Sequence, residues 1–373
     1  MQKKSKILFV ISGVDYSLGF DWLDKYLDRE KFIPMFIFLN SSKPQILDIL
    51  LGRKSNAIFF RLNSRKDYPF LFFKIVRMIR SFKPDIVHTH LLDANFLGIS
   101  AAWFCNVKRR IYTRHHSTYH FDYHPHMVKF DKLVNTMSTH IAAISSNVRD
   151  VLIEKEGVPP SKVFMVEHGF ELRAFIDVDL NKVELLCNKY NPDHRKPVIG
   201  VISRFTEWKG IQFVIPAFKK LLDKYPSALL VLANAKGDYY NQITDQLKVL
   251  PEKSYICISF EKDLFSLYKL FNIFVHVPID PAAEAFGQTY IESLAAGIPS
   301  VFTLSGIARE FVVNEVNALV VNYKNSSEIE MALIRLLENE QLRNTLVKRG
   351  REDVLERFQV QNMMASLYKL YES

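Results

Sequence analysis

Short apolar runs alternate with longer segments of helical periodicity along nearly the whole chain of 373 residues. The runs are apolar on both faces, which is typical of strands buried inside a parallel sheet. Such an alternation favours an α/β fold over a fold built from one kind of element. Candidate strands in the first half lie at 6–12, 32–39, 57–62, 85–90, 109–114, 140–145 and 163–168, with helical patterns such as 69–82 and 146–155 between them.

A polar stretch at 177–197 interrupts this rhythm, and the alternation then starts again. We therefore expect two domains, one over 1–175 and one over 197–359, joined by a linker at 176–196. The end of the chain has a helical pattern, and we expect its last helix, 360–373, to pack back on the first domain. Candidate strands in the second half lie at 198–203, 228–234, 255–260, 273–278, 298–303 and 318–322.

Each half has the strand–helix order of a Rossmann-like domain. The predicted fold class is therefore α/β, with two Rossmann-like domains that face each other across a cleft. In such domains a ligand binds at the carboxyl ends of the strands.

Composition excludes several classes of protein. With 48% hydrophobic and 24% charged residues, the chain is an ordinary globular protein rather than a disordered one. Its three cysteines are scattered, which gives no disulfide framework or zinc spacing and indicates a reducing compartment. The first apolar run, Ile7 to Ile11, is too short for a signal peptide, and no run reaches membrane-spanning length. We expect a cytoplasmic protein, with a peripheral position on the inner face of the membrane as one option.

Charge is distributed unevenly between the two halves. The first 170 residues hold 25 basic and 15 acidic residues, which leaves 24 basic and 25 acidic residues for the remainder. Nine of the 11 histidines also lie in the first part. This asymmetry indicates that the two domains meet different partners.

The stretch EAFGQTYIESLAAGIPSV, 284–301, places two carboxylates around the start of a short helix. Glu284 precedes the helix expected at 288–296, and Glu292 lies about one turn inside it. Gly287 would let the backbone approach a ligand, and free N–H groups in the first turn attract an anion. Eight helical residues rise about 12 Å, roughly the length of a sugar–diphosphate–ribose unit. On spacing alone, an amphipathic helix with incidental acids explains the pattern equally well.

A second stretch, GVISRFTEWKG at 200–210, runs from a strand through a loop into a helix. Arg204 and Lys209 lie at the carboxyl end of that strand, where they could neutralise a pyrophosphate leaving group. An arginine and a lysine in a surface loop are also common as solubility charges.

Together these stretches resemble the retaining glycosyltransferases of the GT-B fold, the family 4-like or group 1 enzymes. SRFTEWKG is similar to the family's Arg-x4-Lys-Gly motif, and 284–301 is similar to its Glu-x7-Glu signature with Phe-Gly and Ala-Gly-x-Pro. The resemblance covers essentially the whole chain and is weaker in the first half. It implies transfer of a sugar, with retention, from a nucleoside-diphosphate sugar to a hydroxyl of a saccharide or lipid-linked acceptor. Typical members build cell-surface polysaccharides and glycoconjugates.

The resemblance also assigns roles to residues of the second domain. Arg204 and Lys209 would hold the donor diphosphate, Glu284 would position the transferred sugar and Glu292 would bind the ribose. No metal or cofactor is expected, because basic side chains and a helix terminus do the work of a cation in this family. The implied donor site further includes Phe286, Gly287 and Gln288 beneath sugar and phosphate, and Ile258, Ser259 and Phe260, whose backbone would read the base.

The first domain departs more from the family. Its loop after the first strand, SGVDYSLGF, has separated glycines instead of the usual pair, and the resemblance places Gly13 toward the donor phosphate. This loop is not Gly-x-Gly-x-x-Gly, which argues against a dinucleotide-dependent dehydrogenase. The family places a histidine after the fifth strand, facing the reacting sugar. His115 fits that pattern and His116 is its neighbour, so both are catalytic candidates.

The histidine-rich stretch 111–127 could also have a role besides catalysis. It could form a zinc site, but no cysteine or evident carboxylate spacing supports one. It could equally be an exposed polar loop. The histidines concerned are His115, His116, His120, His124 and His126.

The segment 68–84 mixes aromatic and basic residues on a helical pattern. It is either a buried helix with a basic edge or a helix that lies on an anionic membrane surface. Nothing in the chain is typical of a nucleic-acid-binding module. Two alternative functions remain: another GT-B enzyme, such as a nucleotide-sugar epimerase or small-acceptor transferase, and a silent nucleotide-sugar-binding protein.

Overall fold

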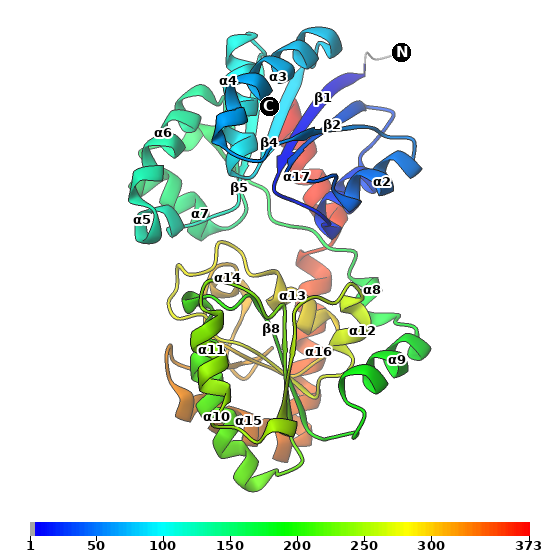
Figure 1. Cartoon of the computed structure of the whole chain (residues 1–373), viewed down its shortest axis with the longest axis vertical. Coiled ribbons are helices and arrows are strands. Elements are labelled where there is room, and N and C mark those ends of the chain that lie inside the picture. The colour runs from blue at the N-terminus through cyan, green and yellow to red at the C-terminus, as the bar shows by residue number, and fades with distance from the viewer. Residues whose placement is uncertain (1–3) are drawn as a thin grey trace. The chain divides into compact units, whose positions relative to one another are not determined.

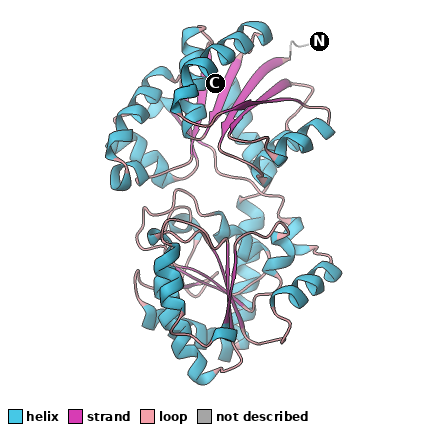
Figure 2. Cartoon of the chain, in the orientation of Figure 1, coloured by secondary structure: helices cyan, strands magenta, loops and turns pink. Residues whose placement is uncertain are grey.

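The computed structural model describes residues 4–373, which form two compact units. The first unit runs to Phe170 and also includes Val360–Ser373, and the second comprises Glu171–Gln359. Each unit is a parallel sheet with helices on both faces, as Figures 1 and 2 show. The predicted α/β class and the two Rossmann-like domains are confirmed.

The sheet of the first unit has seven parallel strands in the order β3-β2-β1-β4-β5-β6-β7. The chain order reverses between β1 and β4, so the crevice that binds ligands in such sheets lies at their carboxyl ends. Central strands are buried along almost their whole length because helices cover both faces. The strands are β1 (Ser5–Ser12), β2 (Phe32–Asn40), β3 (Asn56–Arg61), β4 (Ile86–His90), β5 (Arg109–Arg114), β6 (His140–Ala143) and β7 (Val163–Met165).

Helices α3 and α4 pack against one face of this sheet, and α17 lies on the other (Figure 1). Apolar residues of α3, such as Leu71, Ile75 and Ile79, join the core with strand residues Leu8 and Val10. The helices are α1 (Leu18–Tyr26), α2 (Gln45–Gly52), α3 (Tyr68–Phe82), α4 (Leu92–Phe104), α5 (Tyr119–Tyr123), α6 (Val128–Met137), α7 (Ser146–Asp150) and α17 (Val360–Glu372).

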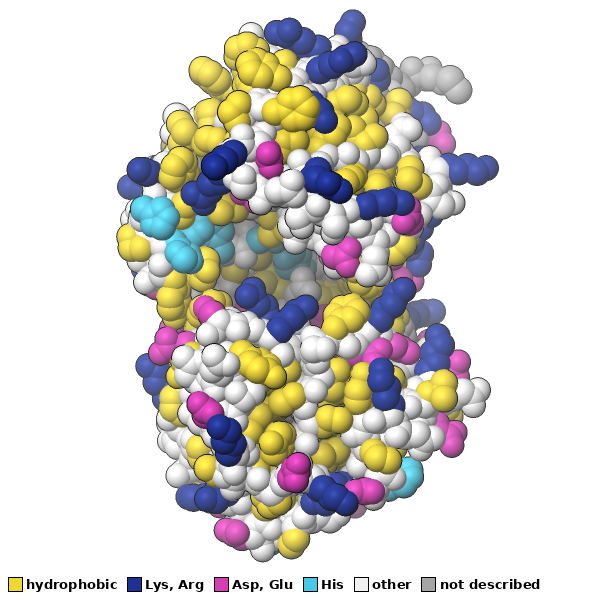
Figure 3. All heavy atoms as spheres, in the orientation of Figure 1, with side chains coloured by type: hydrophobic (Ala, Val, Ile, Leu, Met, Phe, Trp, Pro, Cys, Tyr) yellow, Lys and Arg dark blue, Asp and Glu magenta, His cyan; other side chains and the backbone are white. Residues whose placement is uncertain are grey.

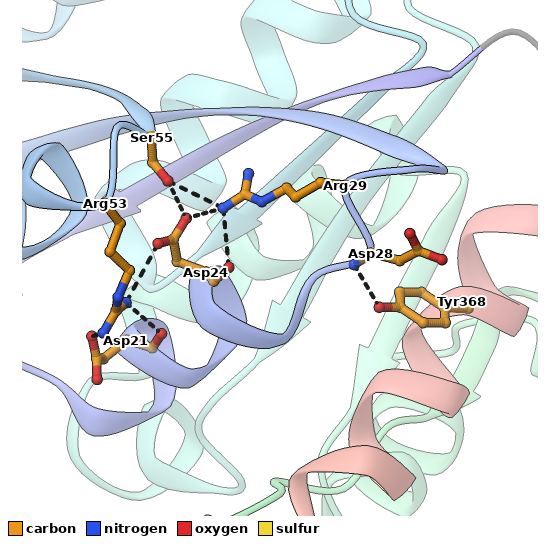
Figure 4. Close-up of polar contacts among 7 residues, drawn as sticks. All are labelled: Asp21, Asp24, Asp28, Arg29, Arg53, Ser55 and Tyr368. Atoms are coloured by element: carbon orange, nitrogen blue, oxygen red, sulfur yellow. Dashed lines mark hydrogen bonds and ion pairs between the residues drawn. The ribbon is translucent and has the colours of Figure 1, made fainter.

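The last helix, α17, is bonded to the first unit through its tyrosines. The backbone N–H of Asp28 donates to the Tyr368 hydroxyl at 2.8 Å (Figure 4). The Tyr371 hydroxyl lies 2.8 Å from Nδ1 of His88 in β4. These bonds connect the last helix of the chain to the loop before β2 and to β4.

Figure 4 also shows a buried carboxylate beside this contact. Asp24 of α1 accepts hydrogen bonds from Arg29, Arg53 and Ser55. Three donors on one buried carboxylate compensate its loss of water and fix α1 against the loops around it.

The second unit has six parallel strands in the order β10-β9-β8-β11-β12-β13, and its order reverses between β8 and β11. The strands are β8 (Val198–Ile202), β9 (Leu229–Ala233), β10 (Tyr255–Ile258), β11 (Ile273–His276), β12 (Ser300–Phe302) and β13 (Leu319–Val320). The helices are α8 (Arg173–Ile176), α9 (Leu180–Tyr190), α10 (Ile211–Lys224), α11 (Tyr240–Leu247), α12 (Leu264–Tyr268), α13 (Gln288–Ala295), α14 (Ala308–Phe311), α15 (Ser326–Glu338) and α16 (Glu340–Arg357).

The stretch 176–196, expected as a linker, instead belongs to the second unit. It contains α9, which packs against α12. Only Leu186 of this helix is buried. Because the rest of α9 faces water, its sequence is as polar as that of a connection, and composition alone does not distinguish the two.

Candidate functional site

The two motifs of the second unit meet at the carboxyl edge of its sheet. The loop after β8 carries Arg204 and Lys209, and the loop after the neighbouring β11 carries Glu284. Gly210, with φ of +74°, brings the two loops together, because a Cβ at this position would lie 1.9 Å from the carbonyl oxygen of Val277. Only glycine allows both this backbone conformation and this approach.

Glu284 is the centre of the contacts at this edge. Its Oε1 lies 2.5 Å from Nζ of Lys209 and 2.9 Å from Nε2 of His276, the last residue of β11. Its backbone N–H donates to Oγ of Ser305 at 2.9 Å. Glu284 is only 7% exposed, and Lys209 and His276 hold its carboxylate while Ser305 holds its backbone.

The charge of Glu284 is stabilised by these partners. Burial alone would raise the pKa of its carboxyl, but Lys209 and His276 outweigh burial and hold the pKa at about 2. Burial lowers the pKa of His276 despite the carboxylate beside it. At neutral pH the site therefore contains an ionised Glu284, its lysine and a neutral imidazole.

Helix α13 begins at Gln288, shortly after Glu284 in the sequence. Gly287 is its N-cap residue with φ of +90°, and no side chain caps the first turn. Phe286 is buried beneath this turn and Gln288 is exposed at its start. The positive end of a helix with an uncapped first turn, next to Lys209, is suited to an anionic group.

Glu292 lies one turn further along α13 and has a different environment. It is 6% exposed, and its Oε2 accepts a hydrogen bond of 2.8 Å from the Tyr268 hydroxyl. Burial raises its pKa to about 7, and the bond from Tyr268 opposes this shift only in part. Near neutral pH this carboxyl can therefore bind or release a proton.

The other predicted donor residues lie along the same edge of the sheet. Arg204 is exposed, and its backbone carbonyl accepts the N–H of Thr206 at 2.9 Å, which fixes the turn. Ile258 ends β10, Ser259 is exposed, and Phe260 is 57% exposed beyond it. Since β10 is two strands from β8, these three residues lie further from Glu284 than Lys209 does.

In the first unit, Gly13 and His115 follow β1 and β5, and His90 is the last residue of β4, which lies between these two strands. Gly13 has φ of +65°, and a Cβ there would meet no atom within 4 Å. Leu91, between β4 and α4, has φ of 72° and ψ of 164°. This backbone region is essentially restricted to glycine and costs about 1–3 kcal/mol, and such strain is concentrated at functional sites.

His115 belongs to a cluster of buried histidines. Its Nε2 lies 3.2 Å from Nδ1 of His90, and its ring stacks on His168 with centroids 5.5 Å apart. Burial, and then the neighbouring histidines, lower the pKa of both His90 and His115 well below the usual value. These rings are therefore neutral hydrogen-bonding groups at physiological pH, and Nε2 of His90 is buried without a partner within the described chain.

His116 points to a different group of residues. Its Nε2 lies 3.3 Å from Oδ2 of Asp131 in α6, and Nδ1 of His120 lies 2.6 Å from the same oxygen. Arg114 bonds both Asp131 and Glu156. The two histidine bonds and Arg114 hold the pKa of Asp131 well below its usual value although burial opposes them.

The five histidines of 111–127 do not converge on one point. His124 bonds the Tyr119 hydroxyl at 2.9 Å, and His115 turns to His90. Within residues 4–373, one group has the composition and spacing of a metal site, namely His116, His120 and Asp131, whose ligand atoms lie within 4.8 Å of one another. Hydrogen bonds and the Arg114 ion pair already account for this arrangement.

Figure 3 shows histidines at the surface over α5.

Two family models match the chain in succession. The model of Glycosyltransferase Family 4 matches residues 26–174, and the model of Glycosyl transferases group 1 matches residues 183–353. The two models fall on the two units of the structure, and the Arg204–Lys209 and Glu284–Glu292 motifs both lie within the second. The chain belongs to the family 4-like glycosyltransferases of the GT-B fold.

Relatives of this glycosyltransferase have related activities. It is 26% identical over 338 residues, 88% of its own length and 85% of the relative's, to the capsular polysaccharide biosynthesis glycosyltransferase CapM of Staphylococcus aureus. It is 23% identical, over 81% of its length and 80% of the relative's, to the N,N'-diacetylbacillosaminyl-diphospho-undecaprenol alpha-1,3-N-acetylgalactosaminyltransferase of Campylobacter jejuni.

A solved structure has the same fold. The Anabaena protein HepE, in complex with UDP and glucose, superposes with a TM-score of 0.84 at 18% identity, with 99% of each chain covered. Among residues 4–373 of this glycosyltransferase, no helix is both long and apolar enough to cross a membrane.

Several site residues are not evident from the sequence. His276 and His90 end strands that can be recognised as strands, so their position at the sheet edge was a usable signal. No sequence signal pointed to Tyr268 or Asp131, because each contacts its site residue, Glu292 or His116, from a separate helix.

Proposed function

We propose that this glycosyltransferase takes its sugar from a nucleoside diphosphate bound at the carboxyl edge of the second unit. The observation that carries the proposal is the contact between the two motifs, in which Lys209 and His276 hold an ionised Glu284 beside the uncapped start of α13. The diphosphate would lie against Lys209, Arg204 and that helix start. HepE, in complex with UDP, supports this class of donor.

Glu284 is suited to positioning the sugar and poorly suited to attacking it. Lys209 and His276 both contact its Oε1, and its pKa of about 2 makes the carboxylate a weak nucleophile. A carboxylate accepts two hydrogen bonds from sugar hydroxyls, and Glu292 could do the same for the ribose diol.

The reaction would proceed with retention. The bond between the anomeric carbon and the diphosphate oxygen breaks, and the acceptor oxygen bonds to that carbon on the same face. The acceptor proton passes to the departing phosphate, whose charge Arg204 and Lys209 stabilise. In this proposal the two basic side chains and the start of α13 take the place of a metal ion.

The acceptor in this proposal is a hydroxyl of a saccharide or a lipid-linked saccharide, bound by the first unit near His115 and His116. The C. jejuni relative is named for a diphospho-undecaprenol substrate and CapM for capsular polysaccharide synthesis, which supports this class of acceptor. A cytoplasmic enzyme of this kind would meet its acceptor at the membrane surface.

The surface formed by α3 and α4 supports contact with an anionic membrane. Its exposed aromatic rings include Phe70 and Phe73, exposed to 64% and 65%, and Trp103 and Phe104 at the end of α4. Lys74 lies 4.4 Å from the centre of the Phe70 ring. Figure 3 shows hydrophobic side chains among Lys and Arg on this part of the first unit. Aromatic rings between basic side chains are typical of an interfacial surface.

A panel of nucleoside-diphosphate sugars tests the proposed activity. Release of nucleoside diphosphate, with or without a saccharide acceptor, should occur with one or a few donors. Lys209→Ala removes a group that stabilises developing charge, and Glu284→Ala removes one that positions the sugar, so each should reduce release by about 100-fold. Unchanged release by both variants, or no release by the wild-type protein with any donor, would contradict the proposal.

A further inference from the structure

A pocket of about 190 Å³ lies within the first unit, beside the carboxyl edge of β4 and β5. Its walls come from α3, β5, α4 and α6 and from the segments before α3 and α6, and the surface that they present to the pocket is mostly apolar. They include Leu92, Phe96, Met127, Phe130 and Val134. A dry cavity of about 150 Å³ holds one benzene ring, so this pocket has room for a somewhat larger hydrocarbon group.

Most of the polar groups that line the pocket already have partners within the protein, and Oδ1 of Asn95 accepts a hydrogen bond from the Thr89 hydroxyl. Arg114 bonds Asp131 and Glu156, and the Tyr112 hydroxyl bonds Asn135. The Tyr68 hydroxyl bonds Asp93 of α4. Since these groups have little left to offer a polar ligand, the chemistry of the interior selects an apolar one.

Arg65 differs from the rest of the lining. It is exposed, and its guanidinium contacts Sδ of Met127 at 3.4 Å. Its guanidinium also interacts with the Tyr68 hydroxyl, but no carboxylate within residues 4–373 forms an ion pair with it, so its positive charge remains available at the pocket. Arginine binds phosphate through two parallel N–H bonds.

The pocket adjoins the surface that the proposed function places at a membrane. Tyr68 lines the pocket and begins α3, and the exposed rings of Phe70 and Phe73 follow within the next two turns. The exposed arginine and the start of α3 at Tyr68 both line the pocket, so the pocket opens beside the first turn of that helix.

We propose that this pocket takes the hydrocarbon chain of a lipid-linked acceptor, with Arg65 on the phosphate next to it. The proposal rests on the lipid-linked acceptor of the proposed function and adds the site that recognises the lipid. Because the pocket lies beside the edge that carries His115, the chain would anchor the acceptor with its sugar near that edge.

Geranyl phosphate, a short prenyl phosphate, is a suitable probe for calorimetric titration of the full-length protein. It should bind at least tenfold more tightly than inorganic phosphate. Val134→Phe and Leu92→Trp, which fill the pocket from α6 and α4, should each weaken binding at least tenfold. Val249→Phe, at a side chain 53% exposed in the second unit, is the matched control and should change nothing. Arg65→Gln should weaken geranyl phosphate but leave geraniol binding unchanged.

Three results would overturn the assignment. The first is that geranyl phosphate binds no better than inorganic phosphate. The second is that Val134→Phe and Leu92→Trp bind it as the wild type does, while circular dichroism shows both variants folded. The third is that Val249→Phe weakens binding as much as these two variants do. Equal affinity for a short-chain phosphatidic acid, with the same response to Val134→Phe, would instead identify a membrane-lipid site. Donor hydrolysis by the wild-type protein, measured separately without acceptor, shows whether the proposed function itself fails.

Discussion

Glu284 and Glu292 are both buried in the second unit, yet their neighbours shift their pKa values in opposite directions. Lys209 and His276 overcome burial at Glu284 and hold its pKa at about 2. Glu292 has a tyrosine but no cation, so burial raises its pKa to about 7. Two carboxyls whose environments separate their pKa values are suited to different tasks. In this account one fixes the sugar and the other binds the ribose.

The pKa of Glu292 predicts that nucleotide affinity depends on pH. An ionised carboxylate accepts two hydrogen bonds from a diol, so binding should strengthen as pH rises through about 7 and the proton leaves. Dissociation constants of the product nucleotide between pH 6 and 8 measure this effect. Glu292→Gln should bind more weakly and lose this pH dependence. The same pH dependence in the variant would place its source elsewhere.

Removal of the Lys209 charge should destabilise the second unit. Breaking a fully buried ion pair costs about 3–5 kcal/mol, and we expect about 2 kcal/mol for Lys209→Met because the lysine side chain is 20% exposed. Urea unfolding at pH 7 measures the loss. Lys209→Met combined with Glu284→Gln should recover most of it, because no buried charge is left unpaired. Equal instability of the double variant would contradict the ion-pair explanation.

The same pair predicts an acid-dependent stability. The pKa of Glu284 is lowered from 4.5 to about 2, so its contribution is complete above about pH 4.5 and is lost as pH falls toward 2. The Lys209→Met protein should show a weaker decline of unfolding free energy over this range.

At the scale of elements, the loop–helix junction at Gly210 determines where Lys209 lies. Gly210→Ala would place a Cβ 1.9 Å from the Val277 carbonyl oxygen and force an unfavourable φ of +74°. We expect a loss of at least about 1–3 kcal/mol in unfolding free energy and a large loss of nucleotide release. Gly52→Ala is the control, because its added Cβ meets no atom within 4 Å at the end of α2. A stable and active Gly210→Ala protein would show that the two loops need not approach so closely.

Helix α3 has one face buried in the core and another that is exposed. Leu71, Ile75, Val76 and Ile79 are buried, as a helix with a basic edge requires, but Phe70 and Phe73 are not. The interpretation of 68–84 as a helix buried on one side is confirmed, and its contact with a membrane stays a prediction that the exposed rings motivate.

The exposed face of α3 predicts binding to anionic lipid. Sedimentation with liposomes rich in phosphatidylglycerol should fall severalfold when Arg77 and Arg80 are changed to Glu, since each basic residue near such a surface contributes about 1 kcal/mol. The changes Lys219→Glu and Lys220→Glu on α10 of the second unit provide a control of equal charge. Equal sedimentation of both double variants and the wild type would count against the surface of α3 and α4.

The strands and α13 could be predicted because their apolar runs, glycines and prolines are local signals. The side-chain partners could not, because they depend on contacts between distant segments. Tyr268 of α12 bonds Glu292 of α13. Asp131 of α6 contacts His116, His120 and Arg114, all of which precede α6 in the sequence. The polar sequence of α9 led to the expectation of a linker at 176–196. A helix with one buried residue has almost no apolar pattern, so its sequence resembles that of a loop.

At the scale of the whole molecule, the uneven charge of the sequence corresponds to two units with different site chemistry. The basic first unit contains the neutral histidine cluster and the apolar pocket, and the second contains the ion pair at Glu284. The two family models divide at nearly the same place. This division supports the proposal that the first unit binds the acceptor and the second binds the donor.

The central claim is that Glu284 holds the sugar and Glu292 the ribose of one donor, and it can be tested by comparing two ligands. Dissociation constants are measured for the preferred nucleoside-diphosphate sugar and for the same nucleoside diphosphate without sugar. Glu284→Gln should weaken the sugar nucleotide about tenfold relative to the diphosphate, the scale of a hydrogen bond to a charged group, because the Lys209 charge that it frees acts on both ligands alike. Glu292→Gln should weaken both ligands by the same factor. Equal loss of both ligands in Glu284→Gln, or a loss confined to the sugar nucleotide in Glu292→Gln, would contradict the assignment.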